Sequence, residues 1–180
     1  MRRILVSFCI LVLSAGAAGA VTTVYTTEAE FLAAIGAAPY MLEDFNGYTY
    51  GSYQELTLDL GPVNGYSCTL SAVQGLWSGD GNMSTNNAGD PIEVAFTGDP
   101  VYSIGGLFFA SDISGFYMPG TVILALSDGT IETYAPPSDT TFRGFVSDTA
   151  IVSMTIDADD TAASAWATMD HYYVGGVDQG

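Results

Sequence analysis

Apolar and polar residues alternate with a period of two along most of this chain. Around Cys68, for example, Tyr66 and Leu70 share the apolar side, whereas serine and threonine occupy the positions between them. Such alternation is typical of strands that bury one face and expose the other. The alternating segments are short, and clusters of Gly, Pro, Asn and Asp separate them, which predicts strands joined by turns. We therefore expect an all-β protein, an antiparallel β-sandwich or a barrel.

The pattern predicts about nine strands and one short N-terminal helix. The strands are expected at residues 56–60, 66–71, 92–97, 101–110, 121–126, 131–134, 142–145, 152–156 and 169–174. Asp128 and Gly129 give the strongest hairpin signal, between the fifth and sixth of these segments. The helix is expected where Thr27 and Glu30 have capping-box spacing and Gly36 ends the apolar stripe.

Residues 1–20 have the pattern of a signal peptide. Arg2 and Arg3 precede an apolar run at residues 4–13, and small residues follow as far as Ala20. The run is shorter than the roughly 20 residues that cross a bilayer. We therefore expect cleavage after Ala20, a single mature domain at residues 21–180, and no membrane insertion after cleavage. The mature protein is expected to be secreted, in the extracellular space or at the cell surface.

The charge of the chain is strongly one-sided. The sequence has 20 acidic residues, 3 basic residues and a formal net charge of −17. Two of the basic residues lie in the expected signal peptide, so Arg143 is the only lysine or arginine of the mature domain. Such a surface repels phosphate backbones, which excludes nucleic acid as a partner, and it attracts divalent cations. We expect Arg143 to pair with a carboxylate, with an anion clamp for a substrate as the alternative.

Few residues of the mature domain suit catalysis. His171 is the only histidine, and Cys68 is the only cysteine outside the signal peptide. This excludes a zinc site of the usual composition and leaves a serine hydrolase triad without support. We expect Cys68 to be buried and unreactive, and the protein to be non-catalytic. A polysaccharide-acting hydrolase or lyase stays open as an alternative, because paired carboxylates are all that its chemistry needs.

Two connections are longer than a turn requires, at residues 78–91 and 111–120, and long loops of this kind commonly carry binding sites. The first contains Asp80, Asn82 and Asp90, oxygen ligands of the type that calcium accepts. Their spacing does not match an EF-hand, and a solvated, turn-rich loop without metal explains the same residues. Both interpretations stay open, with calcium as the candidate cofactor.

Three residues in or beside these connections predict a glycan site. Trp77 directly precedes the first connection, and Asp112 and Tyr117 lie in the second. Aromatic rings cover the apolar side of a sugar ring, while acids and amides bind its hydroxyl groups. Core packing beside Leu76 explains Trp77 equally well. Trp166, which is surrounded by alanines, is expected in the core.

Four motifs follow one another in the second half of the chain. They cover residues 104–109, 126–130, 142–148 and 169–175. With the early helix, they resemble the extracellular β-sandwich domains of bacterial secreted proteins of the PEP-CTERM type. The resemblance implies a jelly-roll-like fold at the cell surface or in an extracellular matrix, and no established enzyme activity. Such proteins typically end in a sorting tail that residues 176–180 do not provide, and similar domains have asparagine in place of His171.

Taken together, the sequence favours a secreted, non-catalytic interaction domain. Its expected partner is an extracellular polysaccharide or matrix, with calcium as a candidate support. Besides the hydrolase or lyase, a second alternative is a self-assembling structural protein, in which a sheet edge or a tyrosine-rich face makes the contacts.

Overall fold

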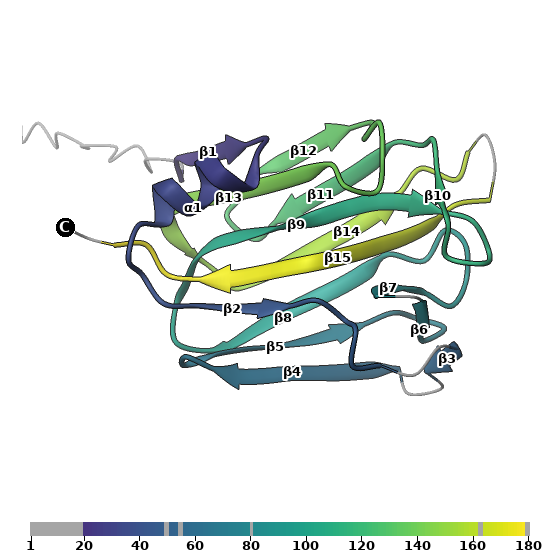
Figure 1. Cartoon of the computed structure of the whole chain (residues 1–180), viewed down its shortest axis with the longest axis horizontal. Helices are drawn as coiled ribbons and strands as arrows, with labels where there is room; N and C mark the ends of the chain where they lie inside the picture. The colour runs from purple at the N-terminus through teal and green to yellow at the C-terminus, as the bar shows by residue number, and fades with distance from the viewer. Residues whose placement is uncertain (1–19, 49–50, 54–55, 80, 162–163, 179–180) are drawn as a thin grey trace, which may run out of the picture.

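The computed structural model describes residues 20–48, 51–53, 56–79, 81–161 and 164–178. It confirms the predicted fold class: two antiparallel sheets form a sandwich, and one short helix lies against one of them (Figure 1). The expected signal peptide lies outside the described residues except for Ala20. Within the described ranges, no helix has the length and apolar character needed to cross a membrane.

The larger sheet, here called sheet A, has nine strands. Its main order is β1-β13-β9-β15-β7-β6-β3, and β10 and β2 pair with β9 and β15 beside this path. The strands are β1 (Thr22–Tyr25), β2 (Tyr40–Glu43), β3 (Gly51–Tyr53), β6 (Leu76–Gly79), β7 (Asn82–Thr85), β9 (Val101–Ser111), β10 (Tyr117–Met118), β13 (Phe142–Ile151) and β15 (Trp166–Gly175). The long strands β9 and β15 lie side by side in the middle of this sheet (Figure 1).

The smaller sheet, sheet B, has six strands in the order β12-β11-β14-β8-β5-β4. They are β4 (Thr57–Val63), β5 (Tyr66–Ser71), β8 (Ile92–Gly98), β11 (Val122–Leu126), β12 (Ile131–Tyr134) and β14 (Ser153–Ala158). The chain crosses between the two sheets repeatedly, for example from β8 to β9 and back to β11. This alternation gives the sandwich its jelly-roll character.

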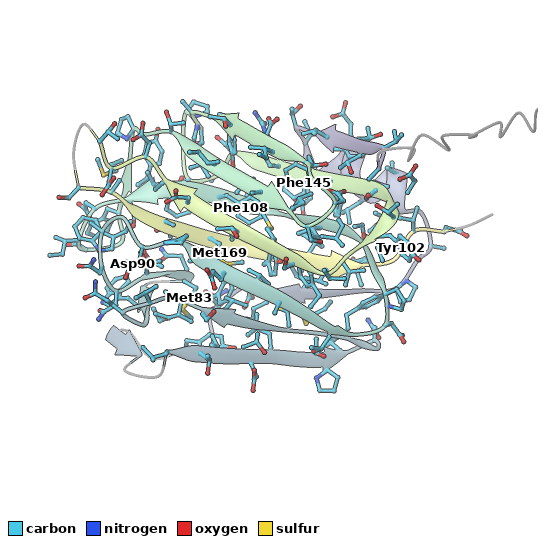
Figure 2. All side chains as sticks on the ribbon, turned by 180° about the vertical axis from the view of Figure 1, so that it is seen from behind. Met83, Asp90, Tyr102, Phe108, Phe145 and Met169 are labelled. Carbon is cyan, nitrogen blue, oxygen red and sulfur yellow. The ribbon has the colours of Figure 1, made fainter. Side chains whose placement is uncertain are left out.

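The main core lies between the sheets and follows the alternation seen in the sequence. In β5, Tyr66, Cys68 and Leu70 are buried and the residues between them are half-buried. Other core residues are Met83, Phe108, Phe145 and Met169 of sheet A, which are labelled in Figure 2. Burial raises the pKa of the Cys68 thiol to about 12. The thiolate is therefore scarce at neutral pH, and Cys68 is a core residue, as the sequence predicts.

A second, smaller core lies under helix α1 (Glu28–Ile35), on the outer face of sheet A. The helix begins as expected: the backbone N–H of Glu30 donates to Oγ1 of Thr27 at 3.3 Å, and Gly36 follows its last residue with φ 65°. Its apolar side buries Phe31 against Phe142 and Tyr173. The hydroxyl of Tyr173 also donates to the carboxylate of Glu28. These contacts fix the helix over β13 and β9.

Arg143 contacts both sheets at one side of the sandwich. Its Nε lies 3.2 Å from Oε1 of Glu132, and its guanidinium carbon lies 4.2 Å from the centre of the Tyr134 ring. Arg143 is in sheet A, whereas both partners are on β12 of sheet B. The predicted carboxylate partner is therefore confirmed, and this contact links the two sheets.

The described residues form fifteen strands, more than the nine or so that alternation predicts. The additional strands β1, β2, β3, β6, β7 and β10 have two to four residues each. The prediction of one long loop at residues 78–91 is wrong for its first half, because β6 and β7 pair there as a hairpin. Leu76 and Met83 are buried in this hairpin, but Ser78, Ser84 and Thr85 are buried as well, so apolar alternation does not reveal it.

Candidate functional site

The outer face of sheet A is divided into two halves. Along β9, Ile104, Phe108 and Ala110 point into the main core, so Leu107 and Phe109 lie on the opposite side. Helix α1 covers the half around Leu107. The other half lies near β6, β7 and β10, at the opposite end of the sheet from α1 (Figure 1).

This uncovered half contains a hollow of about 580 Å³, here called the Phe116 hollow. Phe109, which is itself buried, contributes to its lining from β9. Segments on either side supply its walls, and the side chains that can contact a ligand are aromatic, amide, hydroxyl and carboxylate groups. They are Asn46, Tyr48, Asn82, Ser114, Phe116, Tyr117 and Asp139.

Phe116 is the most prominent aromatic residue of this hollow. Its side chain is 70% exposed, although a phenylalanine of this size is usually buried. Tyr117, which the sequence analysis selected instead, is half-buried: its ring packs 6.4 Å from that of Phe109, and its hydroxyl donates to the carbonyl oxygen of Pro136 at 2.7 Å. Tyr117 therefore contributes to the wall, whereas Phe116 presents a free aromatic surface.

Asp112 organises the turn that carries Phe116. Its Oδ1 accepts hydrogen bonds from the backbone N–H groups of Ser114 at 2.8 Å and of Phe116 at 3.1 Å. The backbone N–H of Asp112 in turn donates to the carbonyl oxygen of Phe116 at 2.9 Å. These bonds close the turn at residues 112–116, here called the 112–116 turn. The predicted ligand residue Asp112 therefore acts on the site by holding this turn in place.

A smaller hollow of about 210 Å³, here called the tryptophan hollow, lies on the other side of the same turn. Trp77 and Trp166 both line it, together with Asp112 and Ile113 of the turn. The remaining lining residues are Ser84, Thr85 and Asn86. Trp166 is half-buried at this surface, so the expectation that it belongs to the core is wrong.

Two glycines shape the wall between the hollows. Trp77 is on the face of β6 opposite the core residue Leu76, and its indole lies over Gly79 and against Gly115. A Cβ atom at Gly115 would lie 2.5 Å from Cζ3 of Trp77, and Gly115 has φ 80°, which favours glycine. Both glycines line the Phe116 hollow, whereas Trp77 lines the tryptophan hollow. The indole is therefore the partition between the two hollows and is not part of the main core.

Buried hydroxyl groups connect the strands beneath the tryptophan hollow. Oγ of Ser111 lies 2.7 Å from Oγ1 of Thr168, which lies 3.0 Å from Oγ of Ser84. The Ser84 hydroxyl also approaches the carbonyl oxygen of Ala167, at 3.2 Å. This chain joins β9, β15 and β7 and satisfies polar groups that would be costly to bury alone. It gives the hollow a rigid floor.

Of the three predicted calcium ligands, the two that the structure describes lie apart. Asp80 lies outside the described residues. Asn82 begins β7 and lines the Phe116 hollow, whereas Oδ2 of Asp90 accepts from the backbone N–H of Gln74, beyond the other end of the β6–β7 hairpin. The rise of a strand separates the ends of β7 by roughly 10 Å, too far for two ligands of one ion. Within the described ranges, no three His, Cys, Asp or Glu side chains cluster as metal ligands would.

The charges that line the two hollows are acidic. Asp139 borders the Phe116 hollow and Asp112 borders the tryptophan hollow, while Arg143 is held by Glu132 and Tyr134 at the side of the sandwich. Beside the Phe116 hollow, hydrogen bonds from the side chain and the backbone N–H of Asn46 lower the pKa of Asp44. That carboxylate is therefore ionised at neutral pH. Both hollows present a negative potential to a ligand.

The comparisons with known proteins find only distant similarity. No family model and no curated protein sequence matches this chain. Among solved structures, a family 29 carbohydrate-binding module, CBM29-2, in complex with mannohexaose is 14% identical, covers 78% of this chain and 93% of its own, and has a TM-score of 0.46. The xylan-binding domain CBM22-1 of Paenibacillus barcinonensis Xyn10C is 14% identical, covers 80% and 98%, and has a TM-score of 0.41. At this level of similarity, neither the ligands nor the binding residues of these modules can be assigned to this chain.

Several residues of the site were missed by the sequence analysis. Asn46 and Tyr48 follow β2, and Asp139 lies between β12 and β13, far from both predicted binding loops. No local pattern marks them, because only the folding of the sheet brings these segments to one hollow. The sequence did offer a signal for Phe116, because a large aromatic residue in a long connection, directly after Gly115, is a candidate for an exposed contact.

Proposed function

We propose that this protein is a secreted, non-catalytic domain that binds polysaccharide on the uncovered half of the outer face of sheet A. The observation that carries the proposal is the exposed ring of Phe116 beside the amides of Asn46 and Asn82 and the carboxylate of Asp139. An aromatic ring gains by covering the apolar side of a sugar, and amide and carboxylate groups can bind the hydroxyl groups around it. The PEP-CTERM-like motifs support the same setting, a cell surface or extracellular matrix.

The direct test is binding to soluble polysaccharides, measured by affinity electrophoresis and by titration calorimetry. We expect Phe116→Ala to lower the affinity by about tenfold or more, since it removes a central aromatic contact. Ile131→Ala is a matched control, because Ile131 is also exposed, at 69%, but lies on β12 away from both hollows. Equal affinities of the wild type and Phe116→Ala would contradict the proposed site.

The non-catalytic part of the proposal has its own measurement. Each polysaccharide that is bound is incubated with the protein, and reducing ends and unsaturated products are measured over time. We expect neither to form. Either product would favour the alternative of a hydrolase or lyase that uses acids such as Asp139. Light scattering on the same samples tests the alternative of self-assembly, which predicts large particles without any glycan.

Calcium support is a separate part of the proposal. Asn82 lines the Phe116 hollow, and its Oδ1 is buried without a hydrogen-bond partner among the described residues. A calcium ion bound to this oxygen would supply that missing contact. Calcium at 100 times its dissociation constant stabilises a protein by about 2.7 kcal/mol, which raises the melting temperature by several degrees. An unchanged melting temperature on addition of calcium or a chelator would remove the metal from the proposal.

A further inference from the structure

The two hollows on the outer face of sheet A lie next to each other and share a border. The 112–116 turn contributes Gly115 and Phe116 to one hollow and Asp112 and Ile113 to the other. The indole of Trp77 lies against Gly115 at this border. A ligand that leaves one hollow along the face of the sheet therefore passes over the turn and the indole and enters the other.

Each hollow has the chemistry for its own sugar unit. The Phe116 hollow combines an exposed aromatic ring with the amides of Asn46 and Asn82. The tryptophan hollow combines Trp77 and Trp166 with the polar side chains of Asn86 and Asp112, which are exposed. A single sugar would use only one of these sets. The repetition of aromatic and hydrogen-bonding groups on both sides of one turn fits consecutive units of a chain.

The charges of the protein limit the class of polysaccharide that can bind. Asp112 and Asp139 are the charged residues that line the two hollows in the described part of the protein, and both are acidic. The one cation of the expected mature domain, Arg143, is engaged with Glu132 at 3.2 Å. With a net charge of −17, the protein repels polymers that carry carboxylate or sulfate groups. A neutral chain avoids this repulsion and still offers hydroxyl groups to the amides.

We propose that the two hollows form one extended site for consecutive units of an uncharged polysaccharide, with Phe116 and Trp166 making the main contacts on the two sides of Trp77. This inference rests on the proposed function and adds the class of ligand and the extent of the site. It assigns a binding role to Trp166, which the sequence placed in the core.

The first experiment compares polymers of different charge. Affinity electrophoresis is run with the neutral polymers glucomannan, arabinoxylan and mixed-linkage β-glucan, and with polygalacturonate and alginate, in low salt and in 0.5 M salt, a concentration that shortens the screening length to about 4 Å. We expect retardation by at least one neutral polymer and none by the polyuronates in low salt. Binding of polyuronates in preference to neutral polymers would overturn the charge argument while leaving a polysaccharide-binding function in place.

The second experiment tests the extent of the site with variants. For the neutral polymer that binds best, we expect Phe116→Ala and Trp166→Ala each to lower the affinity by about tenfold, and Trp166→Phe to retain most of it. Oligosaccharides of increasing length should bind more tightly until both hollows are filled. For the shortest oligosaccharide that binds, only one of the two alanine variants should lower the affinity.

The outcomes separate the inference from the function on which it rests. Loss of affinity in Phe116→Ala but not in Trp166→Ala would overturn the extended site and leave a polysaccharide site in the Phe116 hollow alone. Failure of every polymer to bind would overturn both. Thermal unfolding of each variant shows whether it folds, and Trp166→Phe keeps the test valid if the alanine variant does not.

Discussion

The two halves of the outer face of sheet A differ in whether the rest of the chain covers them. In one half, Gly105 and Gly144 leave room on β9 and β13, and Phe31 of helix α1 fills it. In the other half, Gly79 and Gly115 leave room for the indole of Trp77, but no helix of the described chain follows, and Phe116 stands exposed beside a hollow. In both halves an aromatic ring packs over glycines. Where the face is covered, this packing stabilises the fold, and where the face is uncovered, it leaves an aromatic surface that a ligand can contact.

The largest effect is expected from Phe31→Ala in the covered half. Phe31 is fully buried, with ring centres of Phe142 and Tyr173 at 5.5 and 5.8 Å. Its removal leaves a cavity under the helix and should lower the free energy of unfolding by about 3–5 kcal/mol, measured by chemical denaturation. The affinity of the folded variant for polysaccharide should stay within about twofold of the wild type. A loss of affinity as large as that of Phe116→Ala would show that the two halves are not independent.

A smaller effect is expected from Asp112→Ala, which acts on the uncovered half. This variant removes the acceptor of the Ser114 and Phe116 N–H groups, so we expect stability to fall by about 1–2 kcal/mol. The affinity should fall as well, because the turn no longer holds Phe116. Asp112→Asn keeps an oxygen in the same place and should preserve both quantities. If Asp112→Asn lost affinity at unchanged stability, the carboxylate itself would contact the ligand.

A third variant tests the N-terminal cap of helix α1, the helix that covers only one half of the outer face. Thr27→Ala removes the acceptor of the Glu30 N–H and should cost about 1 kcal/mol of stability, with no change in affinity. Thr26→Ala is the neighbouring control and should have almost no effect. Equal losses in the two variants would mean that the capping bond does not stabilise the helix.

The comparison also explains which parts of the fold could be predicted. The strands β5, β8 and β14 alternate apolar and polar residues because one side faces the main core and the other faces solvent. The helix was predictable because its signals are local: Thr27, Glu30 and Gly36 lie within one segment of ten residues. The hairpin of β6 and β7 could not be predicted, because polar residues such as Ser78 and Ser84 occupy positions on both of its faces.

The site could be predicted only in part, because the face on which a residue lies depends on strand register. Phe116 and Tyr117 are neighbours in sequence, but Tyr117 starts β10 opposite Ser111 and packs on Phe109, whereas Phe116 precedes the strand. Trp166 was assigned to the core because alanines surround it in the sequence, and the predicted last strand began only at Met169. In the structure β15 begins at Trp166, on the same side of the strand as Thr168 and opposite the core residue Ala167.

The smallest effect on stability is expected from Phe116→Ala, although this variant should have a large effect on binding. Phe116 is 70% exposed, so its truncation should change the free energy of unfolding by less than about 0.5 kcal/mol. Phe31→Ala makes the same chemical change in the covered half, with the opposite expected result in both measurements. Denaturation and calorimetry on the two variants therefore test the comparison directly. A stability loss above about 2 kcal/mol for Phe116→Ala would mean that its ring is packed in solution, and the exposed aromatic surface would not exist.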